Sequence, residues 1–223
     1  LADFLGVGPG DVETVLGNDV RQAWGSNNYA MEGVVHASDG DSHEDPWGIR
    51  WQRQYGFNQI SEHPLQGGHR EEVLSYRFPD HLLDEHMAPM SVAAQAAEGY
   101  YLGCDVSPCA FEMYWRVRGM EDALIDFATD SGLAREMIAR CVDFSILLAE
   151  EAIDRFPLDW LWTGDDVAAQ TGMILSPALW RTIVKPELTR LFAVGRKHGL
   201  KIAYHCCGAL RPIIPDLIEI GMD

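Results

Sequence analysis

A pair of metal-binding side chains follows the apolar run 202–204, which predicts a buried strand. Residues two apart on a strand face the same side, so His205 and Cys207 point together and Cys206 points away. An imidazole and a thiolate side by side are good zinc ligands, and Gly208 allows the chain to turn sharply behind them. The pattern also fits a hydrogen-bonded core histidine beside small buried cysteines, and two ligands are only half of a zinc site.

A second polar group follows the apolar run 158–163. Asp165 and Asp166 come directly after Gly164, where a carboxylate can bind a metal, act as a general base or orient a cationic or hydroxylated substrate. Gln170 reaches the same place if a helical turn intervenes. We take Asp165, Asp166 and Gln170 as candidate catalytic residues. The structural alternative is a helix N-cap beside a solvated neighbour.

Two further residues are candidates for substrate binding. Glu112 follows the predicted strand 100–106, although the first turn of a helix favours a carboxylate in any case. Trp47 lies four residues before Trp51 in a polar stretch. Tryptophans in such a place either plug the base of a core, the commoner role, or form the wall of a pocket.

The elements that must position these residues alternate between strands and helices. Apolar runs predict strands at 100–106, 158–163 and 200–205, and amphipathic patterns predict the intervening helices. This alternation implies parallel pairing with right-handed crossovers, and therefore an α/β sheet or barrel. The predicted helices span 108–118, 121–129, 133–155, 177–198 and 211–220.

The first part of the chain has a different pattern. One small helix is expected within residues 1–24, loops and short strand pairs within 25–68, and a helix at 69–76. We expect residues 1–90 to form a loop-rich layer near the carboxyl ends of the strands, not a separate domain. In the long helix that begins at Pro177, Pro186 is expected to separate two helices.

Composition limits the possible partners. The 223 residues are 47% hydrophobic, and 34 Asp and Glu against 17 Lys and Arg give a formal net charge of −17. Such a surface repels nucleic acid and anionic membranes. With no long apolar run and no basic leader, we expect a cytoplasmic protein. Five unevenly spaced cysteines fit reduced thiols or metal ligands better than a disulfide framework.

Several of these segments together resemble the uroporphyrinogen decarboxylase superfamily, in particular its branch of cobalamin-dependent methyltransferases. The likeness extends from about residue 40 over most of the chain. Its motifs are Gly164 to Gln170, Leu175 to Trp180, Lys185-Pro186, Lys197 to Gly199, His205 to Gly208 and Pro215 to Asp223. The resemblance implies a (β/α)8 TIM barrel with its site at the C-terminal mouth. Because only three late strands are legible, we expect one incomplete domain over residues 1–223, with 91–223 as part of the barrel and the rest of the barrel missing.

The resemblance also implies a chemistry. In such methyltransferases a His-x-Cys-Gly signature, matched here by His205 and Cys207, supplies two zinc ligands, and a later cysteine, expected beyond Asp223, supplies a third. A methyl group would move between a small molecule or thiol and a corrinoid (methylcobamide) on a partner protein, in a direction that the sequence leaves open.

Two other functions fit the same scaffold. The first is uroporphyrinogen III decarboxylase, but this chain has no match to the family's arginine-rich N-terminal segment, and an acidic mouth suits a polycarboxylate substrate poorly. The second is a binding protein without catalytic activity, which would tolerate the loss of Asp165 and Asp166.

Overall fold

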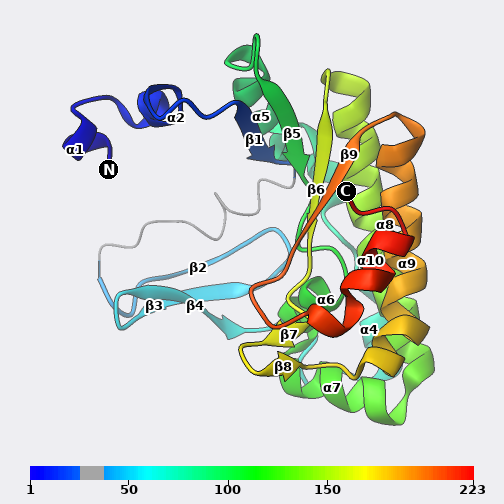
Figure 1. The fold of residues 1–223 in the computed structure, drawn as a ribbon. Helices are drawn as coiled ribbons and strands as arrows, with labels where there is room; N and C mark the ends of the chain where they lie inside the picture. Colours follow the sequence, from blue (N-terminus) through cyan, green and yellow to red (C-terminus); the bar gives the residue numbers. More distant parts are fainter. Residues whose placement is uncertain (26–37) are drawn as a thin grey trace.

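The structure is a computed structural model that describes residues 1–25 and 38–223 (Figure 1). The strands are β1 (Val20–Trp24), β2 (Ser42–Glu44), β3 (Arg50–Gln54), β4 (Phe57–Glu62), β5 (Tyr101–Asp105), β6 (Trp160–Gly164), β7 (Ala168–Ala169), β8 (Gly172–Met173) and β9 (Lys201–His205). The α-helices are α1 (Ala2–Leu5), α2 (Val12–Val15), α4 (Arg70–Ser75), α5 (Leu83–Gln95), α6 (Phe111–Arg118), α7 (Met120–Thr129), α8 (Ser131–Arg155), α9 (Pro177–Lys197) and α10 (Ile214–Glu219). Short 3-10 helices are η1 (Pro9–Asp11), η2 (Asp80–Leu82) and η3 (Arg211–Ile213).

The central sheet contains four parallel strands in the order β1-β5-β6-β9, so strand order in space follows strand order along the chain. Helices α6 to α8 connect β5 to β6, α9 connects β6 to β9, and α8 and α9 lie along one face of the sheet (Figure 1). This arrangement confirms the predicted α/β class and the three late strands. A closed barrel contains eight strands, and the closed barrel remains a prediction.

Strand β1 was not expected, because residues 1–24 predicted only a small helix. Its central residues, Arg21 and Gln22, are polar and hide the strand pattern. Arg21 is nevertheless buried: its guanidinium lies 3.7 Å from the centre of the Tyr100 ring and donates hydrogen bonds to the backbone carbonyls of Asn18 and Val20. A charged side chain that stacks in this way occupies a position where sequence patterns predict an apolar residue.

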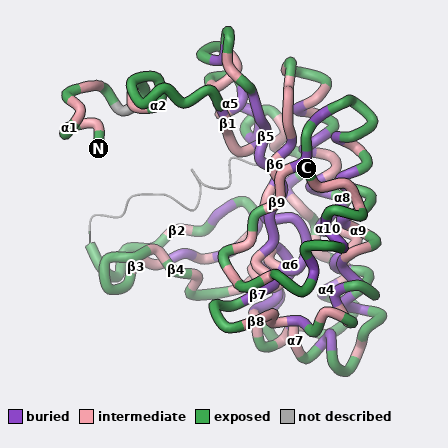
Figure 2. The backbone as a smooth tube through the Cα atoms, viewed as in Figure 1, coloured by how far each residue is buried: buried purple, intermediate pink, exposed green. Residues whose placement is uncertain are grey.

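One face of the parallel sheet packs against helices, whereas the other face has a hollow. Leu102, Cys104, Leu161 and Ile202 are buried, and burial is concentrated where the sheet meets the helices (Figure 2). On the other face a hollow of about 380 Å³ is lined mainly by apolar atoms. Its lining residues are Val20, Tyr101, Trp160, Lys201, Ile202, Ala203, Tyr204, Met222 and Asp223.

Strands β2, β3 and β4 form an antiparallel sheet in the N-terminal layer, which confirms the short strand pairs predicted there. Residues 26–37 of that segment lie outside the described residues. Trp47, Ile49 and Trp51 are buried in the same hydrophobic core as the residues of the parallel sheet. The layer therefore shares its core with the sheet. Helix α5, which was not predicted, crosses the expected boundary at residue 90 and packs mainly on β1.

Helix α9 runs without a break through Pro186, so the expected division into two helices is wrong. A proline has no N–H to offer the carbonyl four residues earlier, here that of Thr182. Arg135 of α8 supplies the replacement donor, with its Nη1 2.7 Å from the Thr182 oxygen. The lost helical bond is thereby compensated from the neighbouring helix. None of the described helices combines the length and apolar character that a membrane span requires.

Candidate metal centre

Three side chains that can bind a metal meet at the carboxyl ends of β6 and β9. One ligand atom from each of Asp166, His205 and Cys207 lies within 4.8 Å of the other two, and Nε2 of His205 is 3.2 Å from Sγ of Cys207. His205 and Cys207 are exposed and Asp166 is half-buried, so solvent and small molecules can reach the group. Cys206 is not a member, as the alternation along a strand predicts. We call these three residues the metal centre.

The pairing of β6 with β9 brings these residues together. Gly164 pairs with His205, and the Asp165 N–H donates to the His205 carbonyl at 3.0 Å, so the chain after β6 stays beside the end of β9. The backbone N–H of Cys207 donates to Oδ1 of Asp166 at 2.7 Å. Asp166 and Cys207 are therefore fixed relative to each other by a backbone hydrogen bond.

Gly208 has a role that differs from the expected sharp turn. Its φ angle is not positive, but a Cβ built on it would lie 2.0 Å from the carbonyl oxygen of Ala168. The next residue, Ala209, donates its N–H to the Ala169 carbonyl at 2.9 Å. Only a residue without a side chain allows the segment after Cys207 to pack this closely on the β7–β8 hairpin.

The donor atoms fit zinc. Nitrogen, sulfur and carboxylate oxygen are all zinc ligands, and bonds of about 2.0–2.3 Å in a tetrahedron place two ligand atoms roughly 3.3–3.8 Å apart. The separation of 3.2 Å between His205 and Cys207 is close to this spacing. Three protein ligands with a fourth position open is the arrangement typical of catalytic zinc.

The protein alone does not favour the thiolate of Cys207. Desolvation, followed by the hydrogen bond and the negative charge of Asp166, raises the pKa of this thiol above its usual value of about 9. A cation between the two side chains would reverse this effect, because it stabilises thiolate and carboxylate together. The electrostatics of the centre thus suit a bound cation better than a free thiol.

Asp165 lies in a different environment from Asp166. It is fully buried, and its carboxylate accepts the N–H groups of Phe111 at 3.0 Å and Glu112 at 2.5 Å, at the start of α6. Burial raises its pKa to about 8, against the lowering effect of these donors. The structure therefore places Asp165 where it accepts the first N–H groups of α6, and not at the N-cap of a helix that follows it in the chain.

Glu112 and Gln170 are placed differently from each other. Oε2 of Glu112 accepts the backbone N–H of Asp166 at 3.1 Å, and Oε1 pairs with Arg116 at 2.7 Å. Glu112 thus supports the metal centre from beneath. Gln170 is exposed in the turn of the β7–β8 hairpin, so the helical turn that would have directed it to the centre is not formed.

Trp47 is buried and belongs to the core. Its ring makes an edge contact with Phe144, with ring centres 6.2 Å apart, and its carbonyl accepts the Tyr76 hydroxyl. It also lines a small gap with Met113 and Ser107. Its position agrees with the plugging role given as the alternative to substrate binding.

Three residues near the metal centre were missed in the sequence. Asp105, at the end of β5, is buried and bonded to both Gln22 of β1 and Ser107. The signal that could have found Asp105 and Ser107 was their position at the end of the predicted strand 100–106, just as Asp166 follows another predicted strand, whereas Gln22 lies on the unexpected strand β1.

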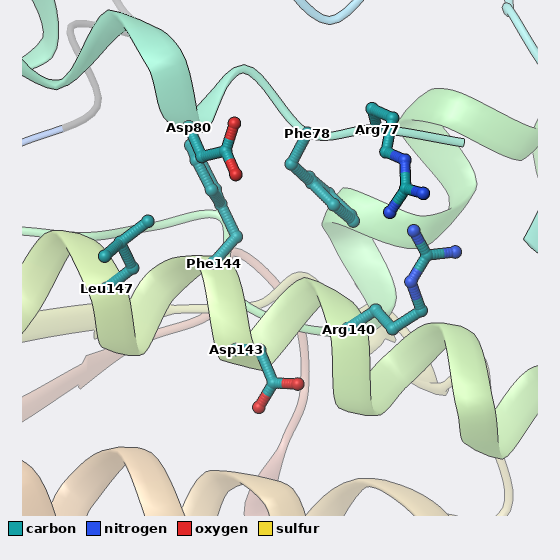
Figure 3. A pocket seen from close by; sticks show the side chains of 7 residues that line it. All are labelled: Arg77, Phe78, Asp80, Arg140, Asp143, Phe144 and Leu147. Atoms are coloured by element: carbon teal, nitrogen blue, oxygen red, sulfur yellow. The ribbon is translucent and has the colours of Figure 1, made fainter. Parts of the chain in front are cut away.

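A hollow of about 230 Å³ on the helical side of the molecule includes two charged residues, Arg140 and Asp143, that already have partners (Figure 3). Arg140 donates to the carbonyls of Leu74 and Tyr76, and Asp143 pairs with Arg190 at 2.6 Å. The hollow is lined by Arg77, Phe78, Asp80, Arg140, Asp143, Phe144 and Leu147. None of the predicted site residues lines it.

Comparisons with known proteins point to one fold. No family model matches the sequence, and no curated protein matches it. Among solved structures, a methyltransferase from Methanosarcina mazei is similar, with a TM-score of 0.66 and 14% identity over 95% of this chain and 58% of that chain. The chain therefore spans somewhat more than half the length of this neighbour and shares the fold of a methyltransferase.

Proposed function

We propose that this chain forms part of a zinc-dependent methyltransferase of the uroporphyrinogen decarboxylase superfamily, which moves a methyl group between a small molecule or thiol and a corrinoid on a partner protein. The observation that carries the proposal is the metal centre, where Asp166, His205 and Cys207 converge at strand ends. The shared fold with a methyltransferase supports the reaction class. Zinc, the corrinoid and the superfamily are parts of the proposal.

The residues of this chain would each have a defined part. Asp166, His205 and Cys207 would hold zinc, and Glu112 would keep Asp166 in place through its backbone N–H. Zinc bound here would supply positive charge that stabilises a substrate thiolate at neutral pH. In transfer to a thiol, a C–S bond to the methyl carbon would form as the C–Co bond of the methylated corrinoid substrate breaks. The electron pair of the broken bond would remain with the corrinoid, and the thiol proton would go to solvent.

The carboxylates at this edge argue against the decarboxylase alternative. Asp166 belongs to the metal centre, Glu112 accepts its backbone N–H, and Arg116 is already paired with Glu112. A substrate with many carboxylates would meet repulsion there. A thiol or a neutral or cationic methyl donor would not.

Zinc binding by four variants tests the proposal. Affinity is measured by competition with a chromophoric chelator for the original protein and for His205→Ala, Cys207→Ala, Asp166→Ala and Cys206→Ala. The loss of an outer partner of a zinc site typically weakens binding by about 10–100-fold, so the first three variants should lose at least about tenfold. Cys206→Ala is the matched control, since it removes a neighbouring thiol outside the metal centre.

The outcomes separate cleanly. Equal zinc affinity in all five proteins, or no zinc binding by the original protein, would leave the His-x-Cys pair a packing feature of the strand. If zinc binds as expected, thioether formation from methylcob(III)alamin and a thiol, measured with the original protein and with Cys207→Ala, tests the transfer itself.

A further inference from the structure

A second polar group lies on the sheet close to the metal centre. Gln22 Nε2 donates to Oδ2 of Asp105 at 3.1 Å. The backbone N–H and the hydroxyl of Ser107 both donate to Oδ1 of Asp105, at 2.8 and 2.5 Å. Asp105 is only 1% exposed, whereas Ser107 and Gln22 are half-buried. A buried carboxylate therefore holds an accessible serine in one orientation.

The strand register places this group beside the metal centre. Asp105 pairs with Trp162, and two residues further along β6 Gly164 pairs with His205, so Asp105 and His205 face the same side of the sheet. A Cβ built on Gly164 would lie 3.1 Å from Cβ of Ser107 and 3.4 Å from Cβ of His205. Ser107 and His205 thus flank a position that carries no side chain.

The hydrogen bonds determine what Ser107 can bind. A hydroxyl has one proton and two acceptor lone pairs. The hydroxyl proton of Ser107 is engaged in the hydrogen bond to Asp105. The Oγ atom can then only accept, so its ligand must donate a hydrogen bond.

The surrounding charge selects among such donors. Asp105, Asp166 and Glu112 bring three carboxyl groups to this edge, and Arg116 is paired with Glu112. Burial raises the pKa of Asp105 to about 7, with smaller effects from Ser107, Gln22 and Glu112, and a nearby cation would favour its ionised form. A protonated amine satisfies both the donor requirement and the charge.

We propose that Ser107, positioned by Asp105 and Gln22, binds the protonated amino group of a small substrate whose reacting atom lies at the metal centre. This subsite rests on the proposed function and adds a substrate class to it, namely a short aminothiol or amine. Ser107 touches the substrate, whereas Asp105 is a positioning residue that acts through Ser107 and through its charge.

Cobalt-substituted protein provides the test, because thiolate binding to Co²⁺ changes its visible and near-ultraviolet absorption. The protein is titrated with three thiols of similar length: 2-aminoethanethiol, 2-mercaptoethanol and 1-propanethiol. Gel filtration confirms that cobalt stays on the protein during each titration. Hydrogen bonds to charged groups contribute about 1.5–3 kcal/mol, so we expect 2-aminoethanethiol to bind about tenfold or more tighter than 1-propanethiol.

Three variants separate the hydrogen bond from the charge. Ser107→Ala should reduce the preference for 2-aminoethanethiol over 1-propanethiol to within about twofold, because one hydrogen bond accounts for roughly a tenfold difference. The affinity for 1-propanethiol should not change. Asp105→Asn should lower affinity for 2-aminoethanethiol but leave the preference for 2-mercaptoethanol over 1-propanethiol. Ser61→Ala, which removes an exposed hydroxyl bonded to the Arg50 carbonyl in the N-terminal layer, is the matched control and should change nothing.

The results distinguish failure of the subsite from failure of the proposed function. If the three thiols bind with equal affinity to cobalt-substituted original protein, and likewise to cobalt-substituted Ser107→Ala, the subsite is wrong and the metal chemistry stands. If cobalt binds but none of the thiols changes its spectrum, both the transfer to thiols and the subsite are rejected.

Discussion

Asp45 follows strand β2 in the N-terminal layer, and Asp166 of the metal centre follows strand β6. The two carboxylates have different burial and different hydrogen-bond partners. Asp45 is buried and accepts the N–H groups of Trp47, Ile49 and the Trp51 indole, at 2.8 to 3.0 Å. Asp166 is half-buried and accepts one backbone N–H, that of Cys207, among the described residues. A carboxylate saturated by internal donors stabilises a fold, whereas one with free lone pairs beside nitrogen and sulfur donors can bind a ligand.

The largest expected effect on stability comes from replacing Asp45 with alanine, compared with the same replacement of Asp166. Asp45→Ala leaves three donors without a partner, and each buried unsatisfied group costs about 1–3 kcal/mol, so the free energy of unfolding should fall by roughly 3–5 kcal/mol. Asp166→Ala should change it by less than about 1 kcal/mol and weaken zinc binding instead. Urea unfolding monitored by circular dichroism measures both variants. Similar losses of stability in the two would remove the distinction between them.

Gly208→Ala perturbs the metal centre without altering a ligand. The added Cβ would collide with the Ala168 carbonyl, so the segment after Cys207 must move away from the hairpin. We expect a loss of about 1–3 kcal/mol in the free energy of unfolding, as overpacking usually costs, together with weaker zinc binding. Gly172→Ala, in the same hairpin but with open space around its Cβ position, is the control. A variant with the affinity of the original protein would show that the close approach does not position Cys207.

The pH dependence of stability sharpens the comparison for carboxylates that are buried. Burial raises the pKa of Asp105 to about 7 and that of Asp165 to about 8, from the ordinary value of 3.8. The folded state therefore binds more protons than the unfolded state between about pH 4 and pH 8, and the free energy of unfolding falls as pH rises through that window. Each unit of pKa difference corresponds to about 1.4 kcal/mol. Urea titrations from pH 4 to 8 should show this slope, reduced in Asp105→Asn; a rising profile would contradict it.

At the acid end the sign is opposite for a carboxylate that is paired with two cations. Arg181 and Lys185 hold the pKa of Asp216 down to about 2, so the contribution of this carboxylate is present above pH 4 and is lost as pH falls through 2. Asp216→Asn should flatten the profile only below pH 4. A change confined to higher pH would assign the effect to other groups.

The smallest expected effect concerns a backbone acceptor. Arg135→Ala leaves the Thr182 carbonyl without the donor that replaces the proline nitrogen, which should cost about 1 kcal/mol or less because this hydrogen bond is exposed. In a Pro186→Ala background the helix supplies its own N–H, so the same change should cost less. A double-mutant cycle by thermal unfolding measures the difference, and additive effects would show that Arg135 does not compensate for the proline.

The sequence predicted what is local and missed what is assembled from distant segments. Strand alternation was enough to place His205 and Cys207 on one side, and adjacency to a strand end was enough to select Asp166. The sequence could not show that Asp165 and Asp166 have different surroundings, because the donors to Asp165 come from the start of α6, more than fifty residues earlier. For the same reason the helix predicted from residue 108 begins at Phe111, where that distant carboxylate caps it.

The missed features have similar origins. Strand β1 was hidden because its buried arginine depends on an aromatic partner outside the strand, and α9 remained whole because a donor on another helix compensates for Pro186. Both depend on contacts that no single stretch of sequence contains. Propensity rules describe isolated segments, and tertiary contacts override them.

The stacking of Trp162 on His205, with ring centres 5.9 Å apart and planes 24° from parallel, gives the protein an optical probe of its own. An indole transfers excited-state charge to a protonated imidazole in contact with it, so its emission depends on what occupies the imidazole nitrogens. A bound metal ion should therefore change the fluorescence of Trp162 in a saturable way. Comparison with Trp162→Phe isolates this signal, so that occupancy of His205 can be followed in the unlabelled protein, in real time, as metal ions are added.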